Sequence, residues 1–331
     1  MTIRTSAVVL PECGRVAVAD VDLPTPGEED LAVRILLSGI SAGTERWVLQ
    51  GRYGPARFPL IPGYQSVGVV ERVGAKVSEF KPGDVVFAGT TRTPEGMHAW
   101  WGGHTARAVL PSSRAVRIPP GVSLEEAALS ALVAVAHHGV RLLPLRPGAI
   151  AAVVGLGMVG QLVAQLLDRA GVVVIGSDPL KARRDRATAL GLRQVVDPAA
   201  EHLEEAVRAL AQDGADVVIE CTGLTHLVGS CLRLLRFGGT LSLQGYYPGN
   251  IVFPFEPAHR AEATIKCPRG WPRSDHEAAL ALLAGKGIRV APLITHRLPA
   301  KDAVHAYELL TSHPEDTLGI VLDWDQRSSG P

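Results

Sequence analysis

The sequence has few cysteines, no excess of charge of either sign and no long apolar run. Its four cysteines lie far apart in a chain of 331 residues and form no CxxC pair, which excludes an evident disulfide framework or zinc knuckle. The 33 basic and 33 acidic side chains cancel, which argues against a nucleic acid or an anionic membrane as partner. No run approaches the roughly 20 apolar residues of a membrane span and no secretory leader is evident, so we expect a cytoplasmic protein.

The first third of the chain has the pattern of a β-rich domain. Short runs of β-type residues alternate with Gly and Pro up to about Pro120, and turn signals such as "KPGD" and "PPGVS" recur between them. This spacing is typical of a barrel or a sandwich. The expected strands are 15–23, 31–39, 66–74, 84–89, 105–110 and 114–119.

From Ser123 the pattern changes to alternating helices and strands. Ser123 and Glu126 have the spacing of a capping box at the start of an expected helix over 123–143. Near-continuous apolar strands then alternate with helices as far as residue 247, and the last of these helices is expected over 227–239. The alternation predicts a doubly wound parallel sheet covered on both faces. The tail after residue 257 is too short for a domain of its own, so we expect it to complete the edge of the second domain and return to the first.

A glycine-rich turn follows the first of these apolar strands. "VVGLGMVG" places Gly155, Gly157 and Gly160 in a G-x-G-x-x-G pattern between a strand and a helix. The first glycine permits a tight turn, the second lets the backbone approach a pyrophosphate, and the third lets helix and strand pack closely. The motif by itself is also compatible with a plain strand-to-helix turn, and its position in the alternating domain favours a dinucleotide site.

A carboxylate stands where the ribose of a dinucleotide is expected. Asp178 ends the next strand, about 20 residues after the glycines, where it can hydrogen-bond the adenosine ribose and repel a 2′-phosphate. NAD is therefore favoured over NADP. NADP stays possible, because Ser177, Lys181, Arg183 and Arg184 could accommodate a phosphate if Asp178 turned away. The alternative is that these side chains, the two arginines among them, form a solvated helix face.

The chain resembles the medium-chain dehydrogenase/reductase family, to which zinc alcohol dehydrogenases belong. The resemblance is carried in family order by "GISAGTE", "PGYQSVGVVERVG", "FKPGDVV", "GGHTARAVLP", "EEAALSALVAVAHHGV", "VVGLGMVGQLVAQLLDRAG" and "FGGTLSLQG". Within the family, "SGISAGTE", "PLIPGYQSVG", "PLITHR" and "VLDW" are most similar to the bacteriochlorophyllide a dehydrogenase-like group.

The resemblance implies an α/β protein with two domains. A GroES-like β-rich catalytic domain would span residues 1–121 and 266–331, a Rossmann domain would span 122–265, and a small-molecule substrate would bind between them. The resemblance also implies a homodimer paired through an edge strand of the Rossmann domain, either "TLSLQGYY" or "NIVFPFEP".

The resemblance further assigns cofactor residues one by one. The backbone of "GLGMVG", including Met158 and Val159, would bind the pyrophosphate. The nicotinamide half would be lined by Thr222, Gly223, Gly245 and Tyr246.

The metal ligands of zinc members are missing from the matching positions. The cysteine position holds Ala42, or Ser41 in an alternative alignment, the "GHE" motif has become "GYQ" with Tyr64 and Gln65, and the third ligand position falls on Ala131. Zinc requires nitrogen, sulfur or carboxylate ligands, so we expect a zinc-free protein.

Without zinc, side chains must handle the proton during hydride transfer. We expect Tyr64 to act as the acid or base, Thr44 and Glu45 to relay and position, and His104 to be a weaker candidate. A positive field from Arg46 or His104 would lower the pKa of the Tyr64 phenol. The alternative is that Tyr64 and Thr44 only pack.

Four aromatic residues fall in segments that border the substrate site in the family. Tyr53, Trp100, Trp101 and Trp271 would suit a large, ring-containing substrate, or would fill the core between the domains.

The combined expectation is a zinc-independent, NAD-preferring oxidoreductase that interconverts a secondary alcohol and a ketone on a ring-containing biosynthetic intermediate. One alternative is an NADPH-dependent quinone or enone reductase. Another, of a different class, is a catalytically decayed protein that binds NAD(H) without turnover.

Overall fold

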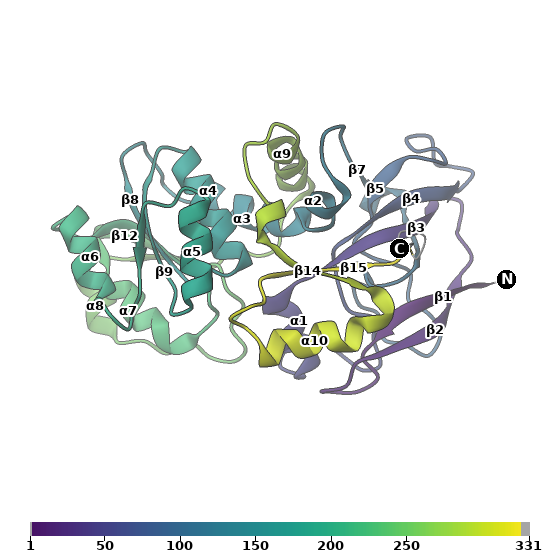
Figure 1. The fold of residues 1–331 in the computed structure, drawn as a ribbon, viewed down its shortest axis with the longest axis horizontal. Coiled ribbons are helices and arrows are strands. Elements are labelled where there is room, and N and C mark those ends of the chain that lie inside the picture. The colour runs from purple at the N-terminus through teal and green to yellow at the C-terminus, as the bar shows by residue number, and fades with distance from the viewer. Residues whose placement is uncertain (1, 326–331) are drawn as a thin grey trace. The chain divides into compact units, whose positions relative to one another are not determined.

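The computed structural model describes residues 2–325, and the chain divides into two compact units. Of the described residues, the first unit contains those up to Ala131, residues 283–285 and those from Ile294 onward. The second unit contains Leu132–Leu282 and Lys286–Leu293. Residues 1 and 326–331, which belong to the expected ranges of the first domain, lie outside the described residues. Figure 1 shows the course of the chain through both units.

The first unit is built on mainly antiparallel strands, as its Gly- and Pro-punctuated sequence predicts. One sheet pairs β1 with β2, and a larger sheet has the order β14-β15-β3-β4-β5-β7, with β6 also paired to β3. The C-terminal β15 lies antiparallel to β3, with Ile320 opposite Ile40 (Figure 1). The strands are β1 Thr2–Val9, β2 Ala17–Pro24, β3 Asp30–Ile40, β4 Ser66–Val73, β5 Val85–Phe87, β6 Arg107–Pro111, β7 Val116–Arg117, β14 Ile294–Pro299 and β15 Gly319–Asp323.

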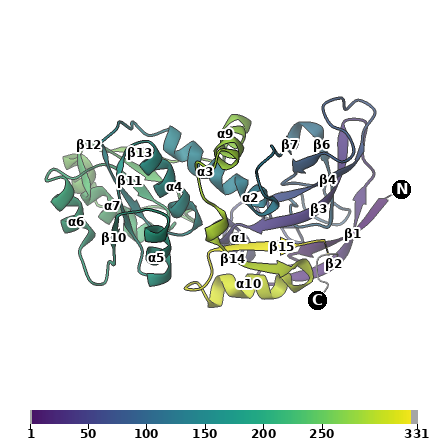
Figure 2. The ribbon, with the colours of Figure 1, turned by 45° about the horizontal axis from the view of Figure 1, so that its top comes forward.

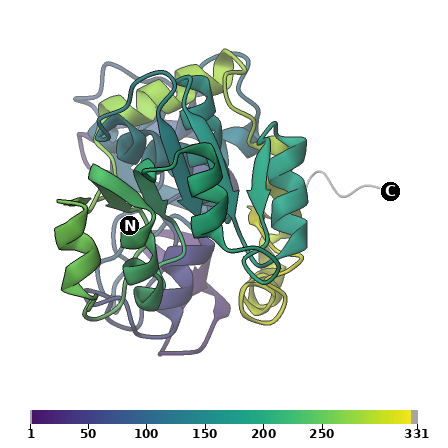
Figure 3. The ribbon, with the colours of Figure 1, turned by 90° about the vertical axis from the view of Figure 1, so that its left-hand side faces the viewer.

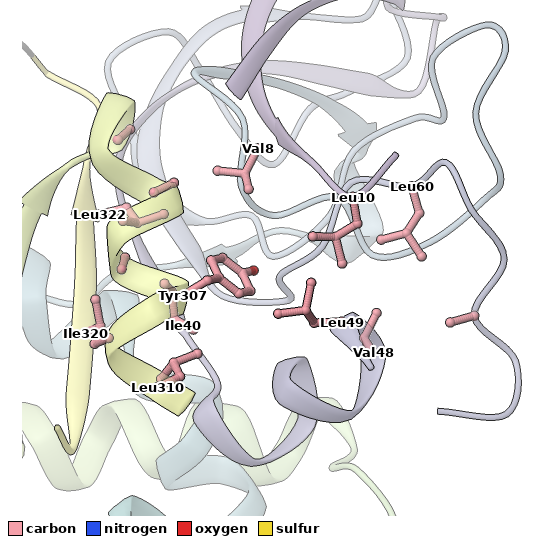
Figure 4. Close-up of a cluster of buried hydrophobic side chains, with 14 residues drawn as sticks. Val8, Leu10, Ile40, Val48, Leu49, Leu60, Tyr307, Leu310, Ile320 and Leu322 are labelled. Atoms are coloured by element: carbon pink, nitrogen blue, oxygen red, sulfur yellow. The ribbon is translucent and has the colours of Figure 1, made fainter. Parts of the chain in front are cut away.

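Three helices belong to the first unit: α1 Ala42–Leu49, α2 Leu124–Ala128 and α10 Ala303–Ser312. Short 3-10 turns cover Ser112–Arg114 and Ala300–Asp302. α10, from the end of the chain, packs beside α1 from its beginning around a shared apolar cluster, in which Tyr307 is the largest side chain (Figure 4). The cluster therefore ties the C-terminal tail to the N-terminal part of this unit.

The second unit holds a six-stranded parallel sheet in the order β10-β9-β8-β11-β12-β13. This is the doubly wound order 3-2-1-4-5-6, in which the strand order reverses between the parallel strands β8 and β11. Figures 2 and 3 show helices on both faces of the sheet. The strands are β8 Ile150–Val154, β9 Val173–Ser177, β10 Gln194–Val196, β11 Ala215–Glu220, β12 Leu235–Leu243 and β13 Thr264–Lys266.

The helices of the second unit follow the expected alternation. They are α3 Ser130–Arg141, whose first turn lies at the unit boundary, α4 Met158–Arg169, α5 Lys181–Ala189, α6 Leu203–Leu210, α7 Val228–Arg233, α8 Phe255–Arg260 and α9 Arg273–Ala284. Short 3-10 turns cover Thr225–Leu227 and Ala291–Leu293. In the described part of the chain, no helix is long and apolar enough to cross a membrane.

Two helix predictions are wrong in extent. The Ser123–Glu126 capping box is present, but the helix expected over 123–143 breaks at Leu129, whose backbone angles of φ −108° and ψ 5° are not helical. The helix expected over 227–239 ends at Arg233, and the chain continues as β12. The break at Leu129 lies between two helices, where Ala128 and Leu129 pack against Gly39 of β3. In the second case the residue pattern is compatible with helix and strand, and contacts distant in sequence decide between them.

The boundaries of the two units differ from the expected domain boundaries in two places. Helix α2 belongs to the first unit, because Gly39 on β3 has no side chain and lets the backbone of Ala128 approach; a Cβ there would lie 2.7 Å from the Ala128 carbonyl oxygen. Most of 266–293, expected in the first domain, belongs to the second unit. Its helix α9 is anchored there by Asp275, which binds Arg141 at 2.9 Å and His137 at 2.8 Å on α3.

The edge strand of the parallel sheet also differs from the prediction. The sheet ends at β13, so "TLSLQGYY", which forms part of β12, is one strand further in. "NIVFPFEP" forms no strand; its last residues begin α8. The physical reason is that Pro254 cannot donate a ladder hydrogen bond and precedes a helix instead.

Candidate active site

The loop "GISAGTER" becomes the start of a helix. Strand β3 ends at Ile40, Ser41 occupies the N-cap position, and α1 begins at Ala42, so Thr44 and Glu45 lie in the first helical turn. The Ser41 N–H donates to Glu45 Oε1 at 2.8 Å, which satisfies a backbone donor at the helix start. This bond turns the Glu45 side chain inward rather than toward solvent.

Glu45 is fully buried and is held by three donors from different parts of the chain. Besides Ser41, its carboxylate contacts His104 Nε2 at 3.0 Å and accepts a hydrogen bond from the Tyr307 hydroxyl. His104 is also fully buried, and its Nδ1 lies 2.8 Å from Ser38 Oγ. Because neither Glu45 nor His104 has exposed surface, any effect of these residues on a substrate passes through their neighbours.

Sequence reasoning missed three members of this buried network: Ser38, Tyr307 and Trp324. The Trp324 indole donates to Ser38 Oγ at 2.8 Å. With a proton on Nε2, His104 donates to Glu45, while Ser38 accepts from Trp324 and donates to His104 Nδ1. No local pattern marks Tyr307 or Trp324, because they reach Glu45 and Ser38 only through the return of the C-terminal tail.

Tyr64 lies at the outer end of this arrangement. Its side chain is 8% exposed, and its hydroxyl lies 2.6 Å from Ser41 Oγ. Burial raises the pKa of the Tyr64 phenol to about 12, the charge of Glu45 adds to the rise, and hydrogen bonds with Ser41 and Thr44 oppose it. The phenol is therefore protonated at neutral pH and available as a hydrogen-bond donor or acid.

The structure contradicts the expectation that a cation lowers the pKa of Tyr64. The Arg46 guanidinium carbon lies 4.6 Å from the centroid of the Trp47 ring, and His104 is engaged by Glu45 and Ser38. The net shift is upward because burial outweighs the local hydrogen bonds. Gly63 keeps Tyr64 close to this network, since a Cβ at Gly63 would lie 2.5 Å from the His104 ring.

Three of the four expected substrate aromatics gather beside Tyr64. The Trp101 ring centroid lies 5.0 Å from Tyr64 and 5.7 Å from Tyr53, and Trp100 lies 4.6 Å from Trp101. These rings are partly buried against the apolar cluster of the first unit. Trp271 does not join them: it belongs to the second unit, with its ring 6.3 Å from His276.

The residues at the former zinc positions do not fit zinc. At the cysteine position they offer the methyl group of Ala42, or the hydroxyl of Ser41 in the alternative alignment. At the other two positions they offer the Tyr64 hydroxyl and the methyl group of Ala131. With its pKa raised to about 12, Tyr64 resists becoming the phenolate that a metal would bind. Within residues 2–325 no group of three His, Cys, Asp or Glu side chains could hold a metal ion.

In the second unit, each glycine of the turn after β8 has a distinct steric role. Gly155 has φ +90°, and a Cβ there would lie 2.5 Å from Thr222 Cγ2. A Cβ at Gly160 would lie 1.9 Å from the Gly155 carbonyl oxygen. At Gly157, the N-cap of α4, a Cβ would meet nothing within 4 Å. Gly157 is thus the position where the fold leaves space for a ligand at the backbone, next to Met158 and Val159, the first residues of α4.

Asp178 follows β9 and is 2% exposed. Its carboxylate accepts the Leu156 N–H at 2.9 Å and the Leu180 N–H at 2.9 Å, so it connects the glycine turn to the start of the next helix. Arg183 Nη1 lies 3.4 Å from the same carboxylate. Ser177, at the end of β9, is buried, and its carbonyl accepts the Gly155 N–H at 2.8 Å.

Arg184 is committed to protein contacts. It donates to Asp197 at 2.5 Å and to the backbone carbonyl of Asp178 at 2.7 Å. Both interpretations, a phosphate-binding side chain and a solvated helix face, therefore fit Arg184 poorly, because its guanidinium is bonded to the protein.

Two loops meet beyond β11 and β12, and they contain the residues assigned to the nicotinamide half. A Cβ at Gly223 would lie 2.5 Å from the Tyr246 carbonyl oxygen, and one at Gly245 would lie 2.5 Å from Gly223 N. The structure therefore brings Thr222, Gly223, Gly245 and Tyr246 together. Sequence reasoning missed Glu220 and Tyr247, which lie beneath these loops.

The whole chain is similar to characterised dehydrogenases. Residues 158–285 match the family model described as zinc-binding dehydrogenase, and residues 27–120 match the alcohol dehydrogenase GroES-like domain. The 2-desacetyl-2-hydroxyethyl bacteriochlorophyllide A dehydrogenase of Cereibacter sphaeroides is 35% identical over 97% of this chain and 98% of its own. The protein of the same description from Rhodobacter capsulatus is 32% identical, with 97% and 98% covered.

A solved structure supports the same relationship. A protein from Sinorhizobium meliloti 1021, crystallised with NADP bound, has a TM-score of 0.84 and 26% identity, covering 97% of this chain and 99% of its own.

These findings define an oxidoreductase of the alcohol dehydrogenase type that uses NAD(P). The chain belongs to the medium-chain dehydrogenase/reductase family, with a GroES-like β-rich unit and a Rossmann unit, as the sequence motifs predict.

Proposed function

We propose that this enzyme interconverts a secondary alcohol and a ketone on a ring-containing biosynthetic intermediate, prefers NAD to NADP, and works without zinc. The observation that carries the proposal is a pair of hydroxyls 2.6 Å apart, that of Tyr64, at one expected metal position, and that of Ser41, beside Ala42 at another. A hydroxyl pair can donate a proton to a carbonyl oxygen, which is the task that zinc supports in other members of the family.

In the direction of ketone reduction, Tyr64 is the proton donor. Bound reduced nicotinamide would supply the hydride to the carbonyl carbon. The Tyr64 O–H donates to the carbonyl oxygen and gives up its proton as that oxygen becomes a hydroxyl. Ser41 and Thr44, the hydrogen-bond partners of Tyr64, stabilise the phenolate that forms. Thr44 is half-buried, so a proton from solvent can return to Tyr64 through its hydroxyl.

Glu45 and His104 are positioning residues in this proposal. Glu45 binds the backbone N–H of Ser41 and so holds the residue that contacts Tyr64. His104 and Tyr307 hold Glu45 in turn. This differs from the initial hypothesis that Glu45 takes part in the relay at the substrate, because a fully buried carboxylate contacts no substrate.

The aromatic group of Tyr53, Trp100 and Trp101 supports a ring-containing substrate. Flat rings pack edge-on or offset against such side chains. Trp100 Nε1 is a buried donor without a protein partner among the described residues, and it suits an acceptor atom on the substrate. The relatives named as bacteriochlorophyllide dehydrogenases act on a molecule of this class, so a hydroxyethyl group on a chlorin-type ring is the substrate to test first.

NAD preference is supported by the position of Asp178. Its buried carboxylate lies one residue beyond β9 and bonds the backbone of the glycine turn, where a 2′-phosphate would meet like charge. Arg183 lies near the same carboxylate and offsets part of this repulsion.

We also propose that the enzyme is a cytoplasmic homodimer. The edge strand β13 carries an exposed Ile265 and, among the described residues, pairs in the sheet with β12 alone, which suits strand pairing between two copies. All four cysteines are free thiols, which is typical of a reducing compartment. Sedimentation velocity at micromolar concentration tests the dimer; a monomer would contradict it.

The decisive test of the chemistry combines turnover with metal analysis. We expect NADH-linked reduction of ring-bearing ketones by chelator-washed protein that contains no stoichiometric zinc. About one zinc per subunit after washing, with activity that follows the zinc content, would refute the zinc-free assignment.

A further inference from the structure

The carboxyl edge of the parallel sheet places Glu220 level with the glycine turn. Glu220, the last residue of β11, pairs with Val154 of β8 and with Leu243 of β12. In a doubly wound sheet, a dinucleotide binds across this edge at the point where the strand order reverses, here between β8 and β11. The adenosine half then lies toward β9, and the nicotinamide half lies toward β11 and β12.

The Glu220 side chain is completely buried and joins the two loops on the nicotinamide side. Its Oε1 accepts the Thr222 N–H at 2.8 Å and the Thr222 hydroxyl. Its Oε2 accepts the Gly223 N–H at 3.0 Å and the Tyr247 hydroxyl. The carboxylate thus receives donors from the loop after β11 on both oxygens and from the loop after β12 on one.

These bonds hold a backbone shape that favours glycine. Gly223 has φ +72°, and a Cβ there would lie 2.5 Å from the Tyr246 carbonyl oxygen. Burial and the Glu220 charge raise the pKa of Tyr247, which keeps the phenol protonated as a donor. The donors bonded to Glu220 do not bind the ligand themselves. Because they hold the loops in place, the other backbone groups of the loops keep a fixed direction in which they can bind it.

We propose that Glu220 is a positioning residue that, through Thr222, Gly223 and Tyr247, holds the two loops in the shape that binds the nicotinamide half of the cofactor. This inference rests on the proposed use of NAD(H). It predicts that loss of the carboxylate harms binding of the nicotinamide half more than that of the adenosine half, because the donors bound by Glu220 lie in the loops after β11 and β12 and not in the glycine turn.

The test compares two ligands in the variant Glu220→Gln. NADH contains the nicotinamide, and ADP-ribose lacks it, so their dissociation constants separate the two halves of the site. The amide can accept on one oxygen only, which leaves the other donors of the loops without a partner. We expect the dissociation constant for NADH, measured by its fluorescence, to rise about tenfold, as for loss of one charge-assisted hydrogen bond. The constant for ADP-ribose, measured by calorimetry, should change less than about twofold.

Two further variants keep the result decisive. Tyr247→Phe removes a single donor at the edge of the cluster and should show the same selective loss, about threefold for NADH, even where Glu220→Gln folds poorly. Asp216→Asn is the matched control: this carboxylate lies on the same strand but at its amino end, where it binds the Ile150 N–H at 2.8 Å. It should lower the melting temperature without changing the ratio of the two constants.

Equal loss of NADH and ADP-ribose binding in Glu220→Gln and Tyr247→Phe would overturn the assignment, as would no loss in either. If the unsubstituted protein binds ADP-ribose and NADH but reduces no ketone, the proposed reaction is refuted. The role of Glu220 is then still decided by the ratio of the two dissociation constants in the variants. If it binds neither ligand, the proposed cofactor use is refuted and this assignment with it.

Discussion

Removing the Tyr64 hydroxyl is the most direct perturbation of the proposed chemistry. The substitution Tyr64→Phe keeps the ring that packs against Trp101 and removes the oxygen 2.6 Å from Ser41 Oγ. A positioned general acid contributes about 10²–10⁴-fold to a rate, so we expect kcat for ketone reduction to fall by about that factor. The dissociation constant of NADH should not change, because the residues assigned to the cofactor belong to the other unit.

The pKa of Tyr64 predicts how the rate depends on pH. Reduction needs the protonated phenol, so its rate through Tyr64 should stay level across neutral pH and fall only as the pH approaches about 12. Alcohol oxidation needs the phenolate. At pH 7, five units below a pKa of about 12, forming the phenolate costs about 7 kcal/mol at about 1.36 kcal/mol per unit. Oxidation should therefore rise about tenfold per pH unit in the alkaline range, and Tyr64→Phe should abolish this slope.

Steady-state and single-turnover rates with NADH from pH 6 to pH 10 provide the assay. Thr5→Val is the control, because it removes another buried hydroxyl of the first unit, the acceptor of the Arg107 N–H at 2.9 Å. It should lower stability and leave kcat and its pH profile unchanged. Near-full turnover by Tyr64→Phe, with NADH bound normally, would refute the proton-transfer role.

Two further predictions concern the cofactor site. Gly160→Ala should abolish cofactor binding and lower the melting temperature, because its Cβ would lie 1.9 Å from the Gly155 oxygen. Gly157→Ala, whose Cβ meets nothing within 4 Å, should keep the melting temperature and weaken NADH binding. If the two variants have equal melting temperatures and equal NADH affinities, the turn holds no pyrophosphate. Asp178→Asn should narrow the preference for NADH over NADPH by about tenfold, through loss of like-charge repulsion of the 2′-phosphate, and an unchanged ratio of the two dissociation constants would remove Asp178 from cofactor selection.

Local pattern predicted most of the fold. Three features depend on residues close together in the chain and can be recognised from the sequence alone. They are the capping box at Ser123, the glycine turn at Gly155 and the alternation of strands and helices. The errors concern the residues at which helices end. The break at Leu129 and the early start of β12 depend on packing against segments far away in the chain.

The candidate site was predictable only in part, for the same reason. Motif positions led to Tyr64, Thr44 and Glu45, and the structure places all three in one region of the first unit. The motifs did not show that Glu45 is buried or that the pKa of Tyr64 rises. Both depend on what surrounds a side chain, and the surroundings include His104 and Tyr307, 59 and 262 residues away from Glu45.

By itself, the sequence determined the family and the two-unit architecture, because these follow from residue types at given places along the chain. Only the tertiary structure decided which carboxylates are buried and what holds them. Glu45 and Glu220 are both fully buried, and each binds donors from loops or helices that meet only after folding. The free energy of a buried charge depends on those partners in space, so no local pattern encodes it.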